Sequence, residues 1–583
     1  MFHSVKMAKL SCCKCFALFF IWILQAPNSS GARVDSYDFI VVGGGTAGCV
    51  IASRCSENPN FSVLVLESGG VPIEDMDVPA FAPTFQVDPE WTFQYKSVPQ
   101  ANASLAYNGV INIPLGRALG GTSSINYMFF NRGSPKDFDN WANIAGDPSW
   151  NYSNMLQYFK KSENYAGQFP PTDQHGIGGP IMITNQSYAP GLDTWLEAGE
   201  ALGYPISDPN GPQIISFTPI EYNKRSGRRV SSYTAFIKPF ENTRSNLQVV
   251  TRAHVTELIM EGNKAVGVKY NNSNEIISVY ATKEVILSAG AYGSPMLLQK
   301  SGIGPRDVLE NAGITQIKDL PVGENLQDHP IVPIQLIINN KSLLFDPERD
   351  LTPENLELYQ REGVGPYTTT AGLFAQAFVA STVATAEGEA DWSDIQFSMY
   401  AQTFLTGLPD VSLGSWEAPI FAYPYLGRQK SRGTVKLDPT NINNQPLIDF
   451  NFLSDPRDFQ ITIDAIQMTM KIMEETVPYR FLGARYPPVP LTVCQDLHFR
   501  SEEYWECYVK QMLVGGNHPV GTCKMGIPAD PETVVDSKLR VVGIDGLRVV
   551  DASIMPVITN ANIQAAIFAI AEKGADEILK DWN

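Results

Sequence analysis

The sequence predicts an α/β protein that contains more than one packed unit. Its 583 residues are too many for one simple core, and its 44% hydrophobic and 18% charged residues are ordinary for a globular chain. The α/β class follows from one stretch near the start. A short apolar strand over 38–42 leads into a glycine turn, a helical segment and a second apolar strand over 62–66. This alternation is typical of parallel strands joined by a helix.

The glycine turn between these strands has the spacing of a dinucleotide-binding site. It reads Gly43-Gly-Gly-Thr-Ala-Gly48, and an acidic residue closes the second strand. The first glycine permits a tight turn, the second lets the backbone approach a pyrophosphate, and the third lets the helix pack on the strand. Phosphates then lie at the helix N-terminus, and the acidic residue accepts hydrogen bonds from a ribose. NAD and FAD proteins both carry such a unit. The predicted cofactor-binding residues here are Gly43, Gly45, Thr46, Ala47, Gly48 and Glu67.

The charge balance argues against polyanionic partners. The formal charge is −18 at pH 7, and a negative surface repels nucleic acids and anionic membranes. No basic cluster in the sequence overrides this repulsion, so we expect no nucleic-acid partner. Small neutral molecules fit the balance better as substrates.

The first 32 residues have the pattern of an export signal. Lys6 and Lys9 precede the apolar run 15–24, and the small residues Ser30 and Ala32 are suitably spaced for cleavage. The run is about half as long as the ~20 residues that a membrane span needs. An uncleaved anchor is the alternative, but no later segment is long and apolar enough to span a bilayer. We therefore expect a secreted protein without a stable membrane anchor.

Cysteines and sequons agree with export. Cys494 and Cys507 flank a polar segment and are a candidate disulfide in an oxidising compartment. His498 between them makes a metal site the alternative, although no fourth ligand stands at a suitable spacing. Cys49 and Cys55 lie in an apolar helical stretch and are expected to be buried thiols. Six Asn-x-Ser sequons are candidate glycosylation sites: Asn60, Asn102, Asn151, Asn185, Asn271 and Asn340.

Two later segments favour a flavin as the bound group. Residues 116–126 are rich in glycine and also carry hydroxyls and an amide. Small residues let the backbone lie against a flat ring, and the polar side chains can hydrogen-bond its edges. Residues 284–295 are predicted to form a strand that ends in a glycine turn, with Ser294 and Pro295 opening a helix.

These motifs resemble those of the glucose–methanol–choline (GMC) flavoprotein oxidoreductases. Segments 116–126 and 290–304 match the family's two signature regions, and the βαβ unit matches its FAD site. Segments 322–330 and 546–573 also look like family sequence, and the overall character resembles arthropod secreted members more than fungal or bacterial ones. The resemblance implies a GMC fold with a Rossmann-like FAD-binding domain and a discontinuous substrate-binding domain built on a β-sheet. The implied boundaries are a signal peptide at 1–32, a mainly FAD-binding part at 33–335, a mainly substrate-binding part at 336–515, and a return to the FAD-binding domain with active-site residues at 516–583.

The resemblance also implies how FAD is held. Some relatives bind FAD covalently through a histidine in the first signature loop, but this chain has Ile125 at that place and no other histidine in the loop. We therefore expect non-covalent FAD. Considered alone, Asp551 is equally well explained as a turn residue that caps its own loop. The implied FAD-binding residues are Thr122 and Asn126 near the pyrophosphate and flavin, Val255 at the adenine, and Asp551 and Ala552 beside the pyrophosphate and ribityl chain.

One rare histidine, His518, lies in the irregular segment 515–526. By itself it is best explained as a hydrogen-bonded loop residue. The resemblance implies that it is the family's active-site histidine, with Asn562 at a partner position where relatives carry His or Asn. Alcohol oxidation removes the O–H proton and moves hydride from carbon to flavin N5. A neutral imidazole can accept that proton, and an amide can orient the oxygen. With Asn at position 562, we expect a single titratable group at this site.

The resemblance leaves several activities open. The leading hypothesis is a secreted FAD-dependent oxidase or dehydrogenase of a small alcohol, such as an aromatic alcohol or the cyanohydrin mandelonitrile, in a defensive secretion, with oxygen or a quinone as acceptor. The alternatives are an FAD–quinone glucose dehydrogenase-like enzyme, an FAD-containing hydroxynitrile lyase that uses the same base without net redox, and a flavoprotein fold kept as a binding component. A nucleophilic pair of Cys523 with His518 would require the two side chains to meet. The sequence does not indicate an oligomeric state.

The presumed substrate region, about 341–511, is rich in aromatic residues. They either clasp an aromatic or apolar substrate or form ordinary strand core. The residues concerned are Phe397, Tyr400, Phe404, Trp416, Phe421, Tyr423 and Tyr425.

Overall fold

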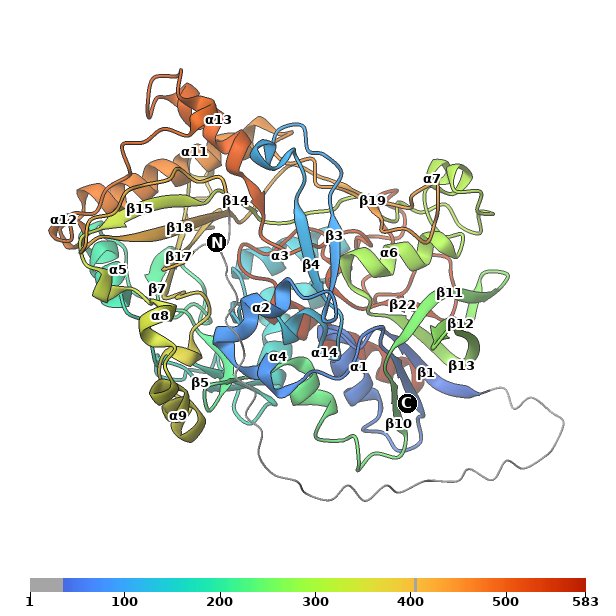
Figure 1. Cartoon of the computed structure of the whole chain (residues 1–583). Helices are drawn as coiled ribbons and strands as arrows, with labels where there is room; N and C mark the ends of the chain where they lie inside the picture. Colours follow the sequence, from blue (N-terminus) through green and yellow to red (C-terminus); the bar gives the residue numbers. More distant parts are fainter. Residues whose placement is uncertain (1–34, 403–405) are drawn as a thin grey trace. The chain divides into compact units, whose positions relative to one another are not determined.

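Two seven-stranded sheets organise residues 35–402 and 406–583, which are those described by the computed structural model (Figure 1). The expected export signal at 1–32 lies outside the described residues. The first sheet contains the predicted nucleotide-binding unit, in which β2 (Val63–Leu66) pairs in parallel with β1 (Ser36–Val42) and with β10 (Leu247–Val250). Its order is β10-β2-β1-β13-β12-β11, with β11 at Ala253–Glu261, β12 at Lys264–Asn272, β13 at Glu275–Leu287, and β22 (Leu547–Val549) beside β13.

The βαβ unit is confirmed, and its structure explains why two of its positions are glycine. Helix α1 (Thr46–Cys55) follows β1 directly, and Cys49 and Cys55 are buried thiols as expected. A Cβ atom on Gly48 would lie 1.9 Å from the carbonyl oxygen of Gly43, so the helix rests directly on the turn. Gly43 itself has a φ of +98°, which favours glycine.

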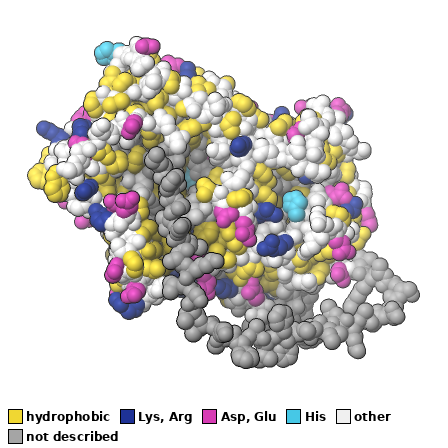
Figure 2. All heavy atoms as spheres, viewed as in Figure 1, with side chains coloured by type: hydrophobic (Ala, Val, Ile, Leu, Met, Phe, Trp, Pro, Cys, Tyr) yellow, Lys and Arg dark blue, Asp and Glu magenta, His cyan; other side chains and the backbone are white. Residues whose placement is uncertain are grey.

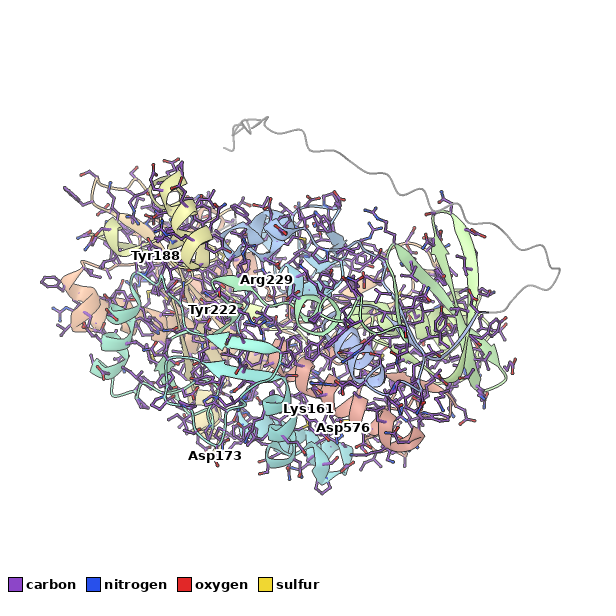
Figure 3. The ribbon with its side chains drawn as sticks, turned by 90° about the horizontal axis from the view of Figure 1, so that it is seen from below. Lys161, Asp173, Tyr188, Tyr222, Arg229 and Asp576 are labelled. Carbon is purple, nitrogen blue, oxygen red and sulfur yellow. A yellow bond between two sulfur atoms is a disulfide. The ribbon has the colours of Figure 1, made fainter. Side chains whose placement is uncertain are left out.

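The C-terminal segment returns to the first unit. Helix α14 (Gln564–Trp582) packs against both α1 and α4 (Tyr152–Ser162). Figure 3 shows Lys161 of α4 beside Asp576 of α14, and their Nζ and Oδ1 atoms are 2.9 Å apart. Arg54 of α1 makes a two-pronged contact with Glu572 of α14 at 2.7 and 2.8 Å. The last residues of the chain therefore hold the glycine turn in place.

The prediction that Ser294 and Pro295 open a helix is wrong. Helix α6 spans Gly290–Lys300, so Pro295 lies inside it. Proline has no N–H to bond the carbonyl of Ala291, four residues earlier. The Thr522 hydroxyl donates to that carbonyl at 2.6 Å and replaces the missing bond. A residue more than 200 positions away thus makes the internal proline acceptable.

The second sheet brings remote segments beside one another. Its order is β21-β14-β18-β17-β16-β7, with β15 beside β18. The pairing of β14 (Pro330–Ile331) with β21 (Val514–Gly515) sets residue 329 opposite residue 516, where the Gly516 N–H donates to the His329 carbonyl at 2.7 Å. The other strands are β7 (Ser216–Thr218), β15 (Ile334–Ile338), β16 (Ala375–Val379), β17 (Ile395–Tyr400) and β18 (Ala418–Leu426).

The candidate disulfide between Cys494 and Cys507 is confirmed, with Cα atoms 6.0 Å apart, and it ties helix α13 (Glu502–Met512) to the segment before it. Cys494 is buried. Figure 2 shows apolar side chains interspersed with charged ones of both signs on the viewed face. Within the described ranges, no helix has both the length and the apolar character that a membrane span requires.

Candidate active site

A cavity of about 750 Å³ lies where the two sheets meet the returning C-terminal segment. Its lining contains the predicted residues from the glycine turn, from the 116–126 loop, from β11 and from the 551–562 region. Gly48 is the one predicted cofactor residue that does not line it, because Gly48 lies beneath the turn. The predicted residues that line the cavity are Gly43, Gly45, Thr46, Ala47, Glu67, Thr122, Asn126, Val255, Asp551, Ala552, His518 and Asn562.

One arm of the cavity has features that suit a nucleotide. Helix α1 begins after Gly45 with no side-chain cap, so its first N–H groups are free to bind an anion. Glu67 is buried, and its carboxylate accepts hydrogen bonds from the N–H groups of Gly44 at 2.8 Å and Gly69 at 2.7 Å. Burial raises the pKa of Glu67 to about 7. The two hydrogen bonds hold the carboxyl group at the cavity wall, at the end of β2.

Asp551 caps its own loop, as the sequence considered alone suggested, and it also lines the cavity. One carboxylate oxygen caps its own loop by accepting from the N–H of Ser553 at 2.8 Å. The other accepts from the N–H of Gly290 at 2.9 Å and from the Ser294 hydroxyl at 2.5 Å, which ties the loop to the start of α6. Burial raises the pKa of Asp551. The C-terminal segment is thus fastened beside the nucleotide arm.

Buried polar atoms in the lining fit a polar ring system. The hydroxyl of Tyr292, Oδ1 of Asn517 and Nε2 of Gln564 are buried and have no hydrogen-bond partner among the described residues. Each such atom costs about 1–3 kcal/mol unless a ligand supplies its partner. Asn126 is held nearby by Arg229, labelled in Figure 3, whose guanidinium donates to the Asn126 side-chain and backbone oxygens, each at 2.7 Å. These donors and acceptors suit the edges of a flavin.

A line of hydrogen bonds determines the protonation of His518. Nε2 of His329 lies 2.8 Å from the carbonyl oxygen of Thr559, which can only accept, so this nitrogen carries the hydrogen. In neutral His329 the other nitrogen, Nδ1, is then an acceptor, and it lies 3.0 Å from Nδ1 of His518. His518 must therefore donate from Nδ1 and keep a lone pair on Nε2. The Asn562 amide donates to that lone pair at 3.1 Å.

The side chain of Asn562 is fixed from behind. Its oxygen accepts from Nδ2 of Asn131 at 3.0 Å and from Nε2 of Gln396 at 2.9 Å. Two donors on the oxygen leave the amide nitrogen to face His518. The structure therefore brings together the two residues that the sequence comparison paired across 44 positions.

The expectation of a single titratable group at this site is wrong. His329 contacts His518 directly, and Asp328 accepts hydrogen bonds from the backbone N–H groups of His518 at 2.6 Å, His329 at 2.8 Å and Asn517 at 3.1 Å. Burial raises the pKa of Asp328 to about 7. His329 and Asp328 were not predicted from the sequence, because only the pairing of β14 with β21 brings them to the site. The one signal for them in the sequence was the presence of a rare histidine in the segment 322–330.

Burial keeps both imidazoles neutral. Burial lowers the pKa of His329 to about 4. Burial and the neighbouring His329 hold the pKa of His518 well below its usual range. The hypothesis of a Cys523–His518 pair is not supported, since the two ring nitrogens of His518 contact His329 and Asn562. Burial also raises the pKa of the Cys523 thiol, which disfavours a thiolate.

The chamber around His518 has aromatic walls. The Tyr425 ring stacks near His518, with centroids 5.9 Å apart, and Tyr400 meets Tyr423 edge to face at 4.8 Å. These three tyrosines line the cavity, whereas Phe397 and Phe421 are core residues, Trp416 is 74% exposed and Phe404 lies outside the described residues. The set is thus divided, since some members line the cavity and others are strand core. Apart from His518, the acidic and basic side chains among the described lining residues are Glu67, His254, Lys300 and Asp551.

A nucleotide arm that opens into an apolar chamber with a neutral imidazole is the arrangement of a dinucleotide-dependent oxidoreductase. Comparison with known proteins narrows this class, and the chain belongs to the GMC oxidoreductase family. The family's N-terminal model matches residues 37–331 and its C-terminal model matches residues 429–571. Members of the family carry FAD and act on CH–OH donors. The expected family, fold and enzyme class are therefore confirmed.

Individual relatives cover nearly the whole chain. Glucose dehydrogenase (FAD, quinone) of Drosophila pseudoobscura pseudoobscura is 34% identical over 94% of this chain and 87% of its own length. The crystal structure of pyridoxine 4-oxidase from Mesorbium loti is 30% identical, covers 93% of this chain and 98% of its own, and has a TM-score of 0.80. A fungal aryl-alcohol oxidase has a TM-score of 0.78 at 26% identity, covering 94% and 99%.

The glycine contacts predict two different consequences of adding a methyl group. Gly48→Ala is expected to lower the melting temperature and the flavin content together, because the new Cβ would meet the Gly43 oxygen at 1.9 Å and overpacking costs about 1–3 kcal/mol. Gly45→Ala finds nothing nearer than 3.9 Å within the protein. It should fold normally and lose flavin, since the backbone there is predicted to approach the pyrophosphate. The ratio of absorbance at 450 and 280 nm and a thermal melt check both variants, and full flavin content in Gly45→Ala would contradict the assignment.

Proposed function

We propose that this protein oxidises the CH–OH group of a small neutral alcohol, with His518 as the base. The observation that carries the proposal is the lone pair on Nε2 of His518, which faces the cavity beside Asn562. FAD, when bound in the cavity, supplies the two-electron acceptor for the hydride. The residues that would hold FAD are Gly43, Gly45, Gly48 and Glu67 at the ADP half, Val255 at the adenine, Thr122 and Asn126 near the pyrophosphate and flavin, and Asp551 and Ala552 beside the pyrophosphate and ribityl chain.

The two side chains divide the work on the substrate hydroxyl. A hydroxyl that enters between them donates to Nε2 of His518 and accepts from the Asn562 amide, replacing their present 3.1 Å contact. His518 then takes the proton while the amide holds the oxygen, which favours hydride departure from an alkoxide-like carbon. The resulting imidazolium keeps its Nδ1–H on His329, whose lone pair is 3.0 Å away. The neutral His329 thus stabilises the charge without removing the proton.

The chamber supports an aromatic alcohol or an aromatic cyanohydrin such as mandelonitrile as the substrate. Aromatic rings pack favourably against other aromatic faces and edges at the spacings that Tyr400, Tyr423 and Tyr425 present. A sugar requires many polar partners, and the lining also contains amide side chains such as Gln402, Asn444 and Gln445, so the test below must decide against the glucose dehydrogenase-like alternative. The fungal aryl-alcohol oxidase, which has the same fold, is consistent with this choice. Oxygen or a quinone then reoxidises the flavin.

Non-covalent FAD and secretion are parts of the same proposal. Ile125 occupies the position of the attaching histidine, and it is buried at 1% exposure. Of the six sequons, Asn60 and Asn185 are exposed and the other four are partly exposed, so each is within reach of glycosylation. A cleaved signal and a disulfide fit an oxidising compartment. A defensive secretion is the setting that an exported aromatic-alcohol or cyanohydrin oxidase would serve.

Anaerobic spectroscopy tests the activity and its alternatives. The purified protein is expected to show a flavin spectrum that bleaches with benzyl alcohol or mandelonitrile and stays oxidised with glucose. Admitting air, or adding a quinone, then identifies the acceptor. Bleaching by glucose alone would favour the sugar alternative. Conversion of mandelonitrile to benzaldehyde and cyanide without bleaching would make the protein a lyase.

Removal of the base should separate chemistry from cofactor binding. His518→Ala is expected to remain yellow and to lose about 10²–10⁴-fold in the rate of flavin reduction, the usual contribution of general-base catalysis. His498→Ala is the matched control, because His498 is exposed and does not line the cavity. Stopped-flow reduction by benzyl alcohol measures both. An unchanged rate in His518→Ala would remove this residue from the mechanism.

The depressed pKa of His518 predicts a flat pH profile around neutrality. The active form is the neutral one, and a base whose pKa lies well below 6.5 is already neutral at pH 7. The rate constant for flavin reduction should therefore be constant from about pH 6.5 to 8.5 and fall only in more acid solution. A rate that rises across pH 7 to 8.5 would indicate a different base.

A further inference from the structure

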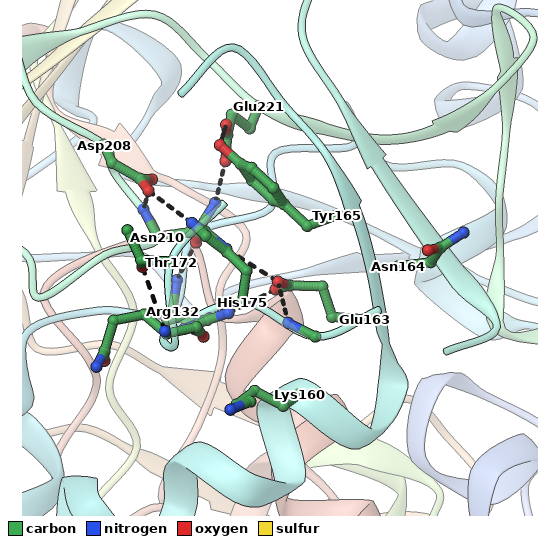
Figure 4. A network of polar contacts seen from close by, with 12 residues as sticks. Arg132, Lys160, Glu163, Asn164, Tyr165, Thr172, His175, Asp208, Asn210 and Glu221 are labelled. Carbon is green, nitrogen blue, oxygen red and sulfur yellow. Dashed lines mark hydrogen bonds and ion pairs between the residues drawn. The ribbon is translucent and has the colours of Figure 1, made fainter. Parts of the chain in front are cut away.

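A closed ring of polar groups, all buried except the partly exposed Asp208, is seen in Figure 4. Arg132 donates to Glu163 at 2.6 Å, and Glu163 contacts Nδ1 of His175 at 3.0 Å. Nε2 of His175 lies 2.7 Å from Asp208. The other Asp208 oxygen accepts from the N–H of Asn210 at 2.7 Å, and the Asn210 side-chain oxygen accepts from the N–H of Arg132 at 3.1 Å. These five residues, called the Arg132 ring below, join four segments of chain.

The geometry requires a charged histidine in the ring. Both nitrogens of His175 face carboxylate oxygens, which cannot donate, so both nitrogens carry hydrogens. Burial alone would lower the pKa of His175, but the hydrogen bonds with Asp208 and Glu163 outweigh it and raise the pKa to about 9. The positive charges of Arg132 and His175 then balance the negative charges of Glu163 and Asp208 within the ring. The other titratable groups that face it are Glu221, Tyr165, which stacks on His175 at 3.5 Å, and Tyr152 near Arg132.

The Arg132 ring forms hydrogen bonds with the backbone on both sides of Asn131. The Asn210 amide accepts from the Arg132 N–H and donates to the Phe130 carbonyl at 2.7 Å. The residue between these two contacts is Asn131, whose side chain donates to the oxygen of Asn562 at 3.0 Å. Asn562 in turn faces His518. One uninterrupted series of contacts therefore runs from His175 to the amide that is proposed to hold the substrate oxygen.

We propose that the Arg132 ring is a positioning device for Asn562, acting through Asn131, and that its closure by His175 is needed for fast oxidation of the substrate. This inference rests on the proposed function for its kinetic consequence. Its structural consequence is independent of any substrate. When His175 is lost, Glu163 and Asp208 face each other without a cation between them, the loop that carries Asn210 moves away, and Asn131 loses its fixed direction.

Hydrogen–deuterium exchange tests the structural part on the holoenzyme. His175→Gln is expected to speed exchange in peptides that contain 128–134 and 559–563, as well as in the loop 167–180. Lys160→Met is the matched control, because it removes the 2.7 Å contact of Lys160 with the Asp173 carbonyl in the same loop but leaves the ring intact. It should affect the loop alone. Exchange that changes only in 167–180 in both variants would overturn the proposal.

A double-mutant cycle tests the kinetic part. His175→Gln is expected to slow flavin reduction by benzyl alcohol by up to about 100-fold, the cost of a misplaced group. The same change in an Asn562→Ala background should have little further effect, because the positioned group is gone. An equal effect in both backgrounds would mean that the ring supports the fold generally, and would overturn the proposal. Wild-type protein that no alcohol reduces would contradict the proposed function, while the exchange result would still decide on the ring.

A conservative variant covers the case in which His175→Gln does not fold. Asp208→Asn can keep the contact with the Asn210 N–H and pair with a neutral His175. In the wild type, the His175 imidazolium keeps its proton through neutral pH and loses it as the pH rises through about 9, so flavin reduction should slow above about pH 8.5. Asp208→Asn should abolish this alkaline decline and leave more than a tenth of the rate at pH 7. An alkaline decline of the same size and position in this variant would exclude His175 as its cause.

Discussion

A peptide carbonyl determines the chemistry of this site. The Thr559 oxygen cannot donate a hydrogen bond, so His329 must donate to it, and His329 must then accept from His518. The only lone pair left on His518 is at Nε2, on the side of the cavity. No charged residue is needed to choose this tautomer. The backbone conformation of the segment 559–562 thereby sets which atom of His518 can act as a base.

The fold holds three remote segments in the geometry that this constraint requires. Pairing of β14 with β21 places 328–331 beside 514–518, and the Asp328 carboxylate binds three backbone N–H groups from both segments. The third segment is held by Asp137, which accepts from the Asn560 N–H at 3.0 Å, and by the contacts on Asn562. Burial then lowers the pKa of both imidazoles. The positions of His329 and His518 and their low pKa values thus result from the same close packing.

The sequence predicted those parts of the site that depend on local pattern. The turn from Gly43 to Gly48 forms the predicted βαβ unit because the apolar strands, the glycine spacing and the acid at 67 lie within about thirty residues. His518 and Asn562 were identified only by resemblance to a family, since nothing local links them. His329 and Asp328 were not predicted, because their contact with His518 depends on pairing between two-residue strands almost 190 positions apart. Pro295 was misplaced for a similar reason, since the Thr522 hydroxyl that supports it comes from the far end of the chain.

Strand alternation explains why the aromatic residues could not be sorted from the sequence. In β17 and β18 successive side chains point to opposite faces, so Phe397 enters the core while Tyr400, Tyr423 and Tyr425 face the cavity. Phe421 shares the face of the three tyrosines but packs in a core cluster and does not line the cavity. A shift of one residue in the pairing would reverse this assignment. The same apolar wall that would receive a substrate ring in the proposed reaction removes water from His518 and keeps it neutral. An anionic substrate would have to lose its hydration in this chamber without a counter-ion, whereas a neutral aromatic alcohol would not. In the proposed function, the desolvation that makes the base available would therefore also disfavour anionic substrates.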